Sequence, residues 1–179
     1  MRYSLILALL VITCSGLFSQ IGLFNLAYDM SLLEADSLLV RQGFMPERPE
    51  DPTMVHYYPV SNPKVESISL VVIPDTYRLA GWMIKYDPDN TEEEDNNVFN
   101  LLIESHRDWF KNYAETGQIV WLLDEGKTVH LVYLNSGQLS VLYYNSEYDG
   151  LFHSSVPEQQ NPEPETQELV PPEQAPTAP

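Results

Sequence analysis

The sequence predicts an α+β fold in which one helix followed by three strands occurs twice. Two segments begin with a Ser/Thr-x-x-Glu pattern and lead into apolar residues at helical spacing, which predicts a capped amphipathic helix in each case. After each of them come three stretches typical of strands, separated by short turn sequences. Two such units can join their sheets edge to edge and pack both helices on one face, so we expect a tandem αβββ repeat with an antiparallel sheet.

The first helix is expected over residues 31–42. Ser31 and Glu34 form a capping box, in which each side chain satisfies an exposed backbone N–H group. Gly43 then supplies the left-handed residue that commonly ends a helix, and Phe44 is placed for the apolar contact that accompanies such an end. The apolar face of this helix consists of Leu32, Ala35, Leu38 and Leu39.

Three strands are expected next, at residues 54–59, 66–72 and 79–86. Apolar side chains alternate along the second of these strands, and the pair Pro74-Asp75 marks the turn that precedes the third. The third strand presents four apolar side chains on one face: Ala80, Trp82, Ile84 and Tyr86.

The pattern restarts at Thr91, where T-E-E-E is a second capping box. Gly117 is expected to end this helix, as Gly43 ends the first. Strands are expected at 118–123, 128–134 and 138–144, with the short glycine-containing connections typical of hairpins. The residues at helical spacing are Phe99, Leu102, Ile103, His106, Trp109, Phe110 and Tyr113. The two units cover about residues 28–88 and 89–153 of a single domain over 21–153.

Residues 1–19 have the features of a secretory signal peptide. Arg2 supplies a positive charge, an apolar stretch covers 5–12, and small residues lead to an expected cleavage after Ser19. The apolar stretch is shorter than the roughly 20 residues that span a bilayer. A lipoprotein signal with Cys14 acylated is the alternative. We therefore expect an exported protein, periplasmic or extracellular, or anchored to the envelope as a lipoprotein.

Residues 154–179 differ sharply in composition from the rest of the chain. They contain seven prolines and five glutamates but no lysine or arginine. Such a segment cannot bury enough apolar surface to offset the entropy of ordering it. We expect an extended, disordered tail.

The charge of the chain excludes several classes of protein. There are 26 acidic and 9 basic residues, and the net charge is −17. Binding to nucleic acid needs clustered Lys and Arg, so a nucleic-acid partner is not expected. A single cysteine excludes an internal disulfide and a cysteine-based zinc site. No phosphate-binding loop, dinucleotide fingerprint, H-E-x-x-H or G-x-S-x-G motif occurs, so we expect neither a cofactor nor an enzyme, with an uncharacterised hydrolase as an alternative.

The acidic run at 87–95 is a candidate site for Ca²⁺ or a small ligand, because dense carboxylates are the ligands that calcium prefers. The calcium ligands would be Asp87, Asp89, Glu92 and Asp95. Against this site, Glu92 stands where an EF-type loop needs glycine, and Val98 where it needs glutamate. The same carboxylates also complement the positive end of the helix dipole, which explains them without a metal.

Aromatic residues in the expected strands are the candidate contact surface. Adjacent pairs such as Tyr143-Tyr144 cannot both face inward, because successive strand residues point to opposite sides of a sheet. Aromatic side chains on an open sheet face suit a protein or glycan partner. The candidate residues are Tyr58, Trp82, Tyr86, Trp121, Tyr133, Tyr143 and Tyr144. Ordinary core packing of these residues is the competing explanation.

The segment 28–43, which begins Y-D-M-S-L-L-E-A, resembles the opening of small exported bacterial domains. In these domains a G-M-S-x-x-E-V helix start leads to a glycine-ended helix and a three-stranded meander. The SmpA/OmlA outer-membrane assembly lipoproteins and the tandem β-lactamase-inhibitory-protein fold have this arrangement. Here Asp29 stands in place of the glycine, the signal for lipidation is poor, and one helix is expected per unit where the family usually has two. The resemblance implies an envelope-located, non-catalytic interaction module and transfers no functional residue.

Together, these observations predict an exported, non-catalytic binding or scaffolding module of the bacterial cell envelope that acts through an aromatic sheet face. A calcium- or small-ligand-binding module with its site at 87–95 is the first alternative, and a hydrolase is the second.

Overall fold

The computed structural model describes residues 21–47, 53–107, 110–124 and 126–153. The expected signal peptide, its Cys14 and the expected tail lie outside the described residues. Within them, three α-helices and one open antiparallel sheet of eight strands confirm the α+β class. No helix in this part of the chain has the length and apolar character needed to cross a membrane.

All eight strands belong to a single sheet with the order β1-β2-β3-β4-β8-β7-β6-β5. Four consecutive strands form a meander in each half, and the two meanders meet where β4 pairs with β8 over Trp82–Lys85. The bounds of β2 are those expected, and the bounds of β3, β4, β6, β7 and β8 lie within one residue of those expected. The strands are β1 (Phe44–Pro46), β2 (Met54–Pro59), β3 (Val65–Ile73), β4 (Arg78–Tyr86), β5 (Phe110–Tyr113), β6 (Gln118–Leu122), β7 (Lys127–Tyr133) and β8 (Leu139–Asn145).

The expectation of three strands per unit is wrong, because each half contains four. In the first half, β1 follows Gly43 directly and pairs with β2. In the second half, β5 occupies residues that were expected to continue the helix. Phe110 lies at helical spacing from Phe99, yet it pairs with Trp121 across the sheet. The helix ends instead at His106, because the next residue, Arg107, has a φ of 64° that is incompatible with a continuing α-helix.

Both long helices begin as expected. In α2 (Leu32–Arg41) and α3 (Glu92–His106), the Ser31 and Thr91 side chains accept a hydrogen bond from the backbone three residues on, and a glutamate closes each capping box. Gly43, after the end of α2, has a φ of 87° and is the expected left-handed stop. Gly117 has a φ of 63° but lies in the turn between β5 and β6, not at a helix end.

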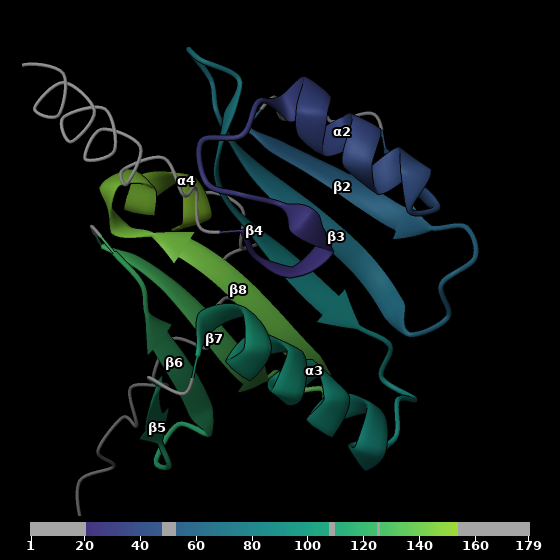
Figure 1. Cartoon of the computed structure of the whole chain (residues 1–179), viewed down its shortest axis with the longest axis vertical. Coiled ribbons are helices and arrows are strands. Elements are labelled where there is room, and N and C mark those ends of the chain that lie inside the picture. The colour runs from purple at the N-terminus through teal and green to yellow at the C-terminus, as the bar shows by residue number, and fades with distance from the viewer. Residues whose placement is uncertain (1–20, 48–52, 108–109, 125, 154–179) are drawn as a thin grey trace, which may run out of the picture.

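The core lies between the sheet and these two helices, which cover the same face (Figure 1). Ala35 and Leu39 of α2 and Val98 and Leu102 of α3 are buried against alternate residues of the central strands. The short α4 (Asp149–His153) lies on the opposite face: a Cβ built on Gly81 would be only 2.7 Å from the ring of Phe152. The side chain next to Gly81 in β4, that of Trp82, belongs to the core, so the two faces are distinguished directly.

The segment 21–30 runs between α2 and α3 on the helical face, as Figure 1 shows. It contains the short 3₁₀ helix η1 (Leu23–Asn25), and its Leu26 is completely buried. Beyond the β4–β8 pairing, the backbone groups of Leu79 bond instead to Asp29 and Met30, at 3.0 and 2.9 Å. This segment is therefore part of the fold and separates the two helices.

Candidate functional site

The structure does not gather the seven candidate aromatic residues on one exposed face. Four of them are buried in the core beneath the helices: Trp82, Tyr86, Trp121 and Tyr143. Trp82 and Tyr143 stack with ring centroids 4.1 Å apart. These four residues have packing roles, as the competing explanation stated, and they offer no surface to a partner.

The other three candidates are scattered. Tyr58 in β2 and Tyr144 in β8 lie on the face opposite the long helices, with β3 and β4 between their strands. The ring of Tyr144 packs against Phe152, so α4 covers part of that face. Tyr133 lies on the helical side and donates a hydrogen bond of 2.8 Å to Asp95; partial burial, followed by this bond, raises the pKa of Tyr133 to about 12. An open aromatic sheet face is thus absent from the described residues.

The acidic run at 87–95 is used by the fold. Glu94 closes the capping box of α3 and pairs with Lys64 at 3.1 Å, while Asp87 accepts a hydrogen bond from the backbone of Asp89. Asp95, as noted, accepts from Tyr133. Across the part of the chain that the structure describes, no three His, Cys, Asp or Glu residues are grouped so that they could hold a metal ion.

One pair of groups resembles part of a hydrolytic site. His56 Nδ1 lies 2.8 Å from the hydroxyl oxygen of Ser69, across the β2–β3 pair. However, Ser69 is only 4% exposed and lies in an inner strand of the sheet. Its hydroxyl is therefore not accessible to a substrate, and the contact is a side-chain hydrogen bond between two neighbouring strands.

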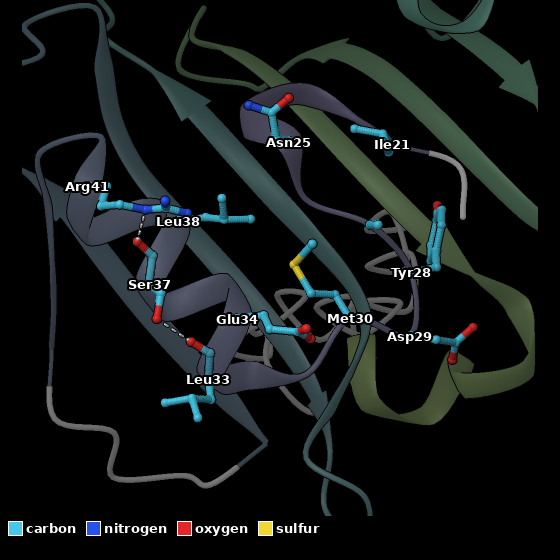
Figure 2. A pocket seen from close by; sticks show the side chains of 11 residues that line it. Ile21, Asn25, Tyr28, Asp29, Met30, Leu33, Glu34, Ser37, Leu38 and Arg41 are labelled. Atoms are coloured by element: carbon cyan, nitrogen blue, oxygen red, sulfur yellow. Dashed lines mark hydrogen bonds between the residues drawn. The ribbon is translucent and has the colours of Figure 1, made fainter. Parts of the chain in front are cut away.

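The surface beside α2 contains the feature best suited to binding. A hollow of about 690 Å³ lies between α2 and the segment 21–30 (Figure 2). The side chains of Met30 and Leu38 point into it from opposite sides, and Ile21 lies on its rim. Its lining is mostly apolar, which is typical of surfaces that bind other molecules.

A second hollow, of about 510 Å³, lies on the other side of α2. It is bordered by the sheet edge at Pro46 and Val55 and by Tyr77 in the turn before β4. Leu33 lines both hollows and is 76% exposed. We call Leu33 and the two hollows the α2 surface. Because Leu33 is shared by both depressions, the two form one apolar patch around an exposed leucine, and exposed apolar surface of this kind is a candidate interaction site.

Carboxylates surround this apolar patch. Asp29 and Glu34 border the first hollow, and Asp36 and Glu47 border the second. Hydrogen bonds from Ser31 hold the pKa of the Glu34 carboxyl below its usual range, so this group is charged at neutral pH. Arg41 is the basic residue that lines the first hollow, and its Nε donates to the carbonyl of Ser37 within α2.

Long-range hydrogen bonds hold the inner wall of the first hollow. The backbone N–H of Leu23 donates to the Tyr143 hydroxyl at 2.9 Å, and that hydroxyl also lies 3.0 Å from His106 Nε2. Burial lowers the pKa of His106 to about 4, so the imidazole is neutral at pH 7. The Tyr28 hydroxyl donates to the carbonyls of Thr128 and Tyr144. The wall is therefore attached to β7, β8 and α3.

The sequence contains a signal for the α2 surface that lies outside the candidate aromatic residues. Leu33 lies outside the apolar face formed by Leu32, Ala35, Leu38 and Leu39, and Val40 shares its side of the helix. Both are exposed in the folded chain. A second apolar stripe on a helix whose Leu32, Ala35 and Leu39 already pack against the core indicates a further contact.

Comparison of the chain with known protein families, curated proteins and solved structures finds no match. Its function must therefore be inferred from its own surface.

Proposed function

We propose that the chain is an exported, non-catalytic binding module of the bacterial envelope that holds a protein partner at the α2 surface. The observation that carries the proposal is the position of Leu33, 76% exposed and flanked on both sides by apolar hollows. Burying such a side chain against a partner contributes about 1.5–3 kcal/mol, which is the size of an interface hot spot. This surface replaces the aromatic sheet face as the proposed contact.

The wall of the first hollow is already held in place by the chain's own contacts, so the binding surface is preformed. Leu23, Leu26 and Tyr28 of the segment 21–30 are buried, and hydrogen bonds to Tyr143 and to two strand carbonyls hold the segment in place. A preformed surface loses little conformational entropy when a partner binds. A binding module benefits from this property.

Site-specific cross-linking tests the proposed contact. The photoreactive residue p-benzoylphenylalanine is introduced at Leu33 in cells that produce the full-length sequence, and adducts are identified by mass spectrometry after irradiation. We expect a discrete adduct with one protein. The matched control places the same residue at Leu101, which is 48% exposed on α3. Equal adducts at both positions, or none at Leu33, would contradict the proposal.

Export is tested separately. The basic residue, apolar stretch and small residues at 1–19 support it. We expect the protein recovered from the cell envelope or medium to begin at Gln20, as measured by intact mass. An N-terminal lipid on Cys14 would support the lipoprotein alternative instead. Recovery of the uncleaved chain from the cytosol would contradict both forms of the proposal.

We further propose that the two halves are a tandem repeat of one helix and four strands. The order of elements supports this, since α2 precedes β1–β4 and α3 precedes β5–β8, and each helix starts at a capping box. Pairing of the two fourth strands, β4 and β8, suits a two-fold relation. In an experimental structure, α2–β4 should superpose on α3–β8 strand for strand. A helix that crosses its sheet at a different angle in one half would contradict the repeat.

A further inference from the structure

We infer that the partner of the α2 surface presents a cationic amphipathic helix. This inference rests on the proposed function and specifies the chemistry of the partner. Leu33 lies between two apolar hollows, so an occupant needs apolar side chains on both sides of it. One face of an amphipathic helix supplies such side chains at intervals of three and four residues.

The charged groups around the α2 surface indicate the sign of the charge that its partner carries. The two hollows are lined by four carboxylates, those of Asp29, Glu34, Asp36 and Glu47, and by one guanidinium, that of Arg41. A second guanidinium, that of Arg78, donates to the Asp29 carbonyl and lies close enough to Glu34 to attract its carboxylate, so carboxylates still outnumber cations here. Most of these carboxylates also have partners within the chain. Asp36 accepts from the Tyr57 hydroxyl at 3.0 Å, and Asp29 lies 3.7 Å from Lys127.

The same charges disfavour a negatively charged partner. An anionic segment would bring its carboxylates against this rim on a chain whose net charge is −17. Like charges placed across an interface are unfavourable, and complementary charges raise the rate of association. Lysine and arginine flanking the apolar residues of the partner satisfy the rim without burying an unpaired charge.

Three designed peptides test the inference by fluorescence anisotropy on protein purified from cells that make the full-length sequence. The first is an 18-residue Leu/Lys helix with leucines on one face. The second replaces every lysine by glutamate, and the third replaces every leucine by serine. We expect the Leu/Lys peptide to bind at least about tenfold more tightly than either of the others, with affinity that falls as salt rises.

Two pairs of variants localise the binding. The substitution L33Q should weaken the Leu/Lys peptide at least about fivefold, and L101Q less than twofold. The triple variant E34Q/D36N/E47Q keeps hydrogen-bonding groups at each position and raises the net charge by three. The triple variant D89N/E92Q/E93Q raises it equally at the start of α3. Only the first triple variant should weaken the peptide.

The outcomes separate this inference from the proposed function. If Leu/Lys and Leu/Glu peptides bind equally and both depend on Leu33, the α2 surface stands and the cationic partner is rejected. If Leu/Lys and Ser/Lys peptides bind equally and L33Q has no effect, both are rejected. Equal weakening by the two triple variants would show general attraction to an acidic protein and would overturn the inference.

Discussion

The hydroxyl of Tyr143 accepts a hydrogen bond from the backbone N–H of Leu23 at 2.9 Å, although 120 residues separate the two. Tyr143 lies in β8 at the centre of the sheet, and Leu23 begins the short η1 helix of the segment that walls the first hollow. The bond satisfies a buried N–H group that no regular strand or helix would satisfy. One side chain therefore connects the centre of the sheet to the wall of the candidate site.

Replacing Tyr143 by phenylalanine should destabilise the protein. The change leaves the ring stacked on Trp82 but leaves the Leu23 N–H without its acceptor and removes the contact with His106. An unsatisfied buried donor costs about 1–3 kcal/mol. Urea denaturation should show a loss of that size. Tyr58→Phe, which removes an exposed hydroxyl bonded to Glu47, should change the free energy of unfolding by less than about 0.5 kcal/mol. Equal losses would contradict the assignment.

Gly22→Ala should be poorly tolerated for a steric reason. The backbone of Gly22 is extended, with a φ of −99°, so alanine meets no conformational obstacle. An added Cβ would, however, lie 2.4 Å from a ring carbon of Tyr143 and 2.7 Å from Trp82. Both rings are fully buried, and we expect a loss of at least about 1–3 kcal/mol. Gly150→Ala in α4 meets nothing within 4 Å and should be neutral or slightly stabilising. Thermal unfolding of the two variants should differ accordingly.

Local sequence patterns were sufficient for the elements whose signals are local. The capping boxes at Ser31 and Thr91 locate both helix starts, and alternation locates β3 and β4 to within one residue. The missed strand β5 shows the limit of periodicity. Phe99 and Phe110 are compatible with one helix face, but tertiary packing decides otherwise: the two rings meet edge to face, 5.6 Å apart, from a helix and a strand.

The candidate site was harder to predict because burial depends on which elements cover which face. Tyr143 and Tyr144 must point to opposite sides, but the sequence does not say that α2, α3 and the segment 21–30 cover the first and α4 part of the second. Nor does it show that Tyr28 inserts its hydroxyl between two strand carbonyls. These contacts join residues at least 100 positions apart, beyond the reach of a local pattern.

Asp29 has a φ of 61°, in the left-handed region that favours glycine. A residue with a Cβ costs roughly 1–2 kcal/mol there, less for Asp than for most. Asp29→Gly should therefore match or exceed the stability of the natural chain, since the ion pair with Lys127 is long, at 3.7 Å, and solvent reaches it on the Asp29 side, so it contributes little. Asp29→Ala removes the same carboxylate but keeps the Cβ, so it should be less stable than the glycine variant by at least about 1 kcal/mol. Equal stabilities in urea would contradict the explanation.

His106 should make the stability of the protein depend on pH. Burial lowers its pKa from 6.5 to about 4, so the folded chain keeps the imidazole neutral where the unfolded chain already binds a proton. Between these two pH values the unfolded state holds more protons, and the free energy of unfolding must fall as the pH falls. Protonation also places a donor on Nε2, so the Tyr143 hydroxyl 3.0 Å away can then only accept from this atom.

The pH dependence is isolated by comparing variants in urea at pH 7 and pH 5. His106→Gln retains a group that can accept from Tyr143 but cannot titrate, so its free energy of unfolding should fall less between the two pH values than that of the natural chain. Burial also lowers the pKa of His130, so the variant should keep part of the dependence. His153→Gln, at the exposed end of α4, corrects for removal of a histidine. A natural chain whose stability falls no more steeply than that of His106→Gln would show that His106 titrates normally, and an NMR titration would then place its pKa near 6.5.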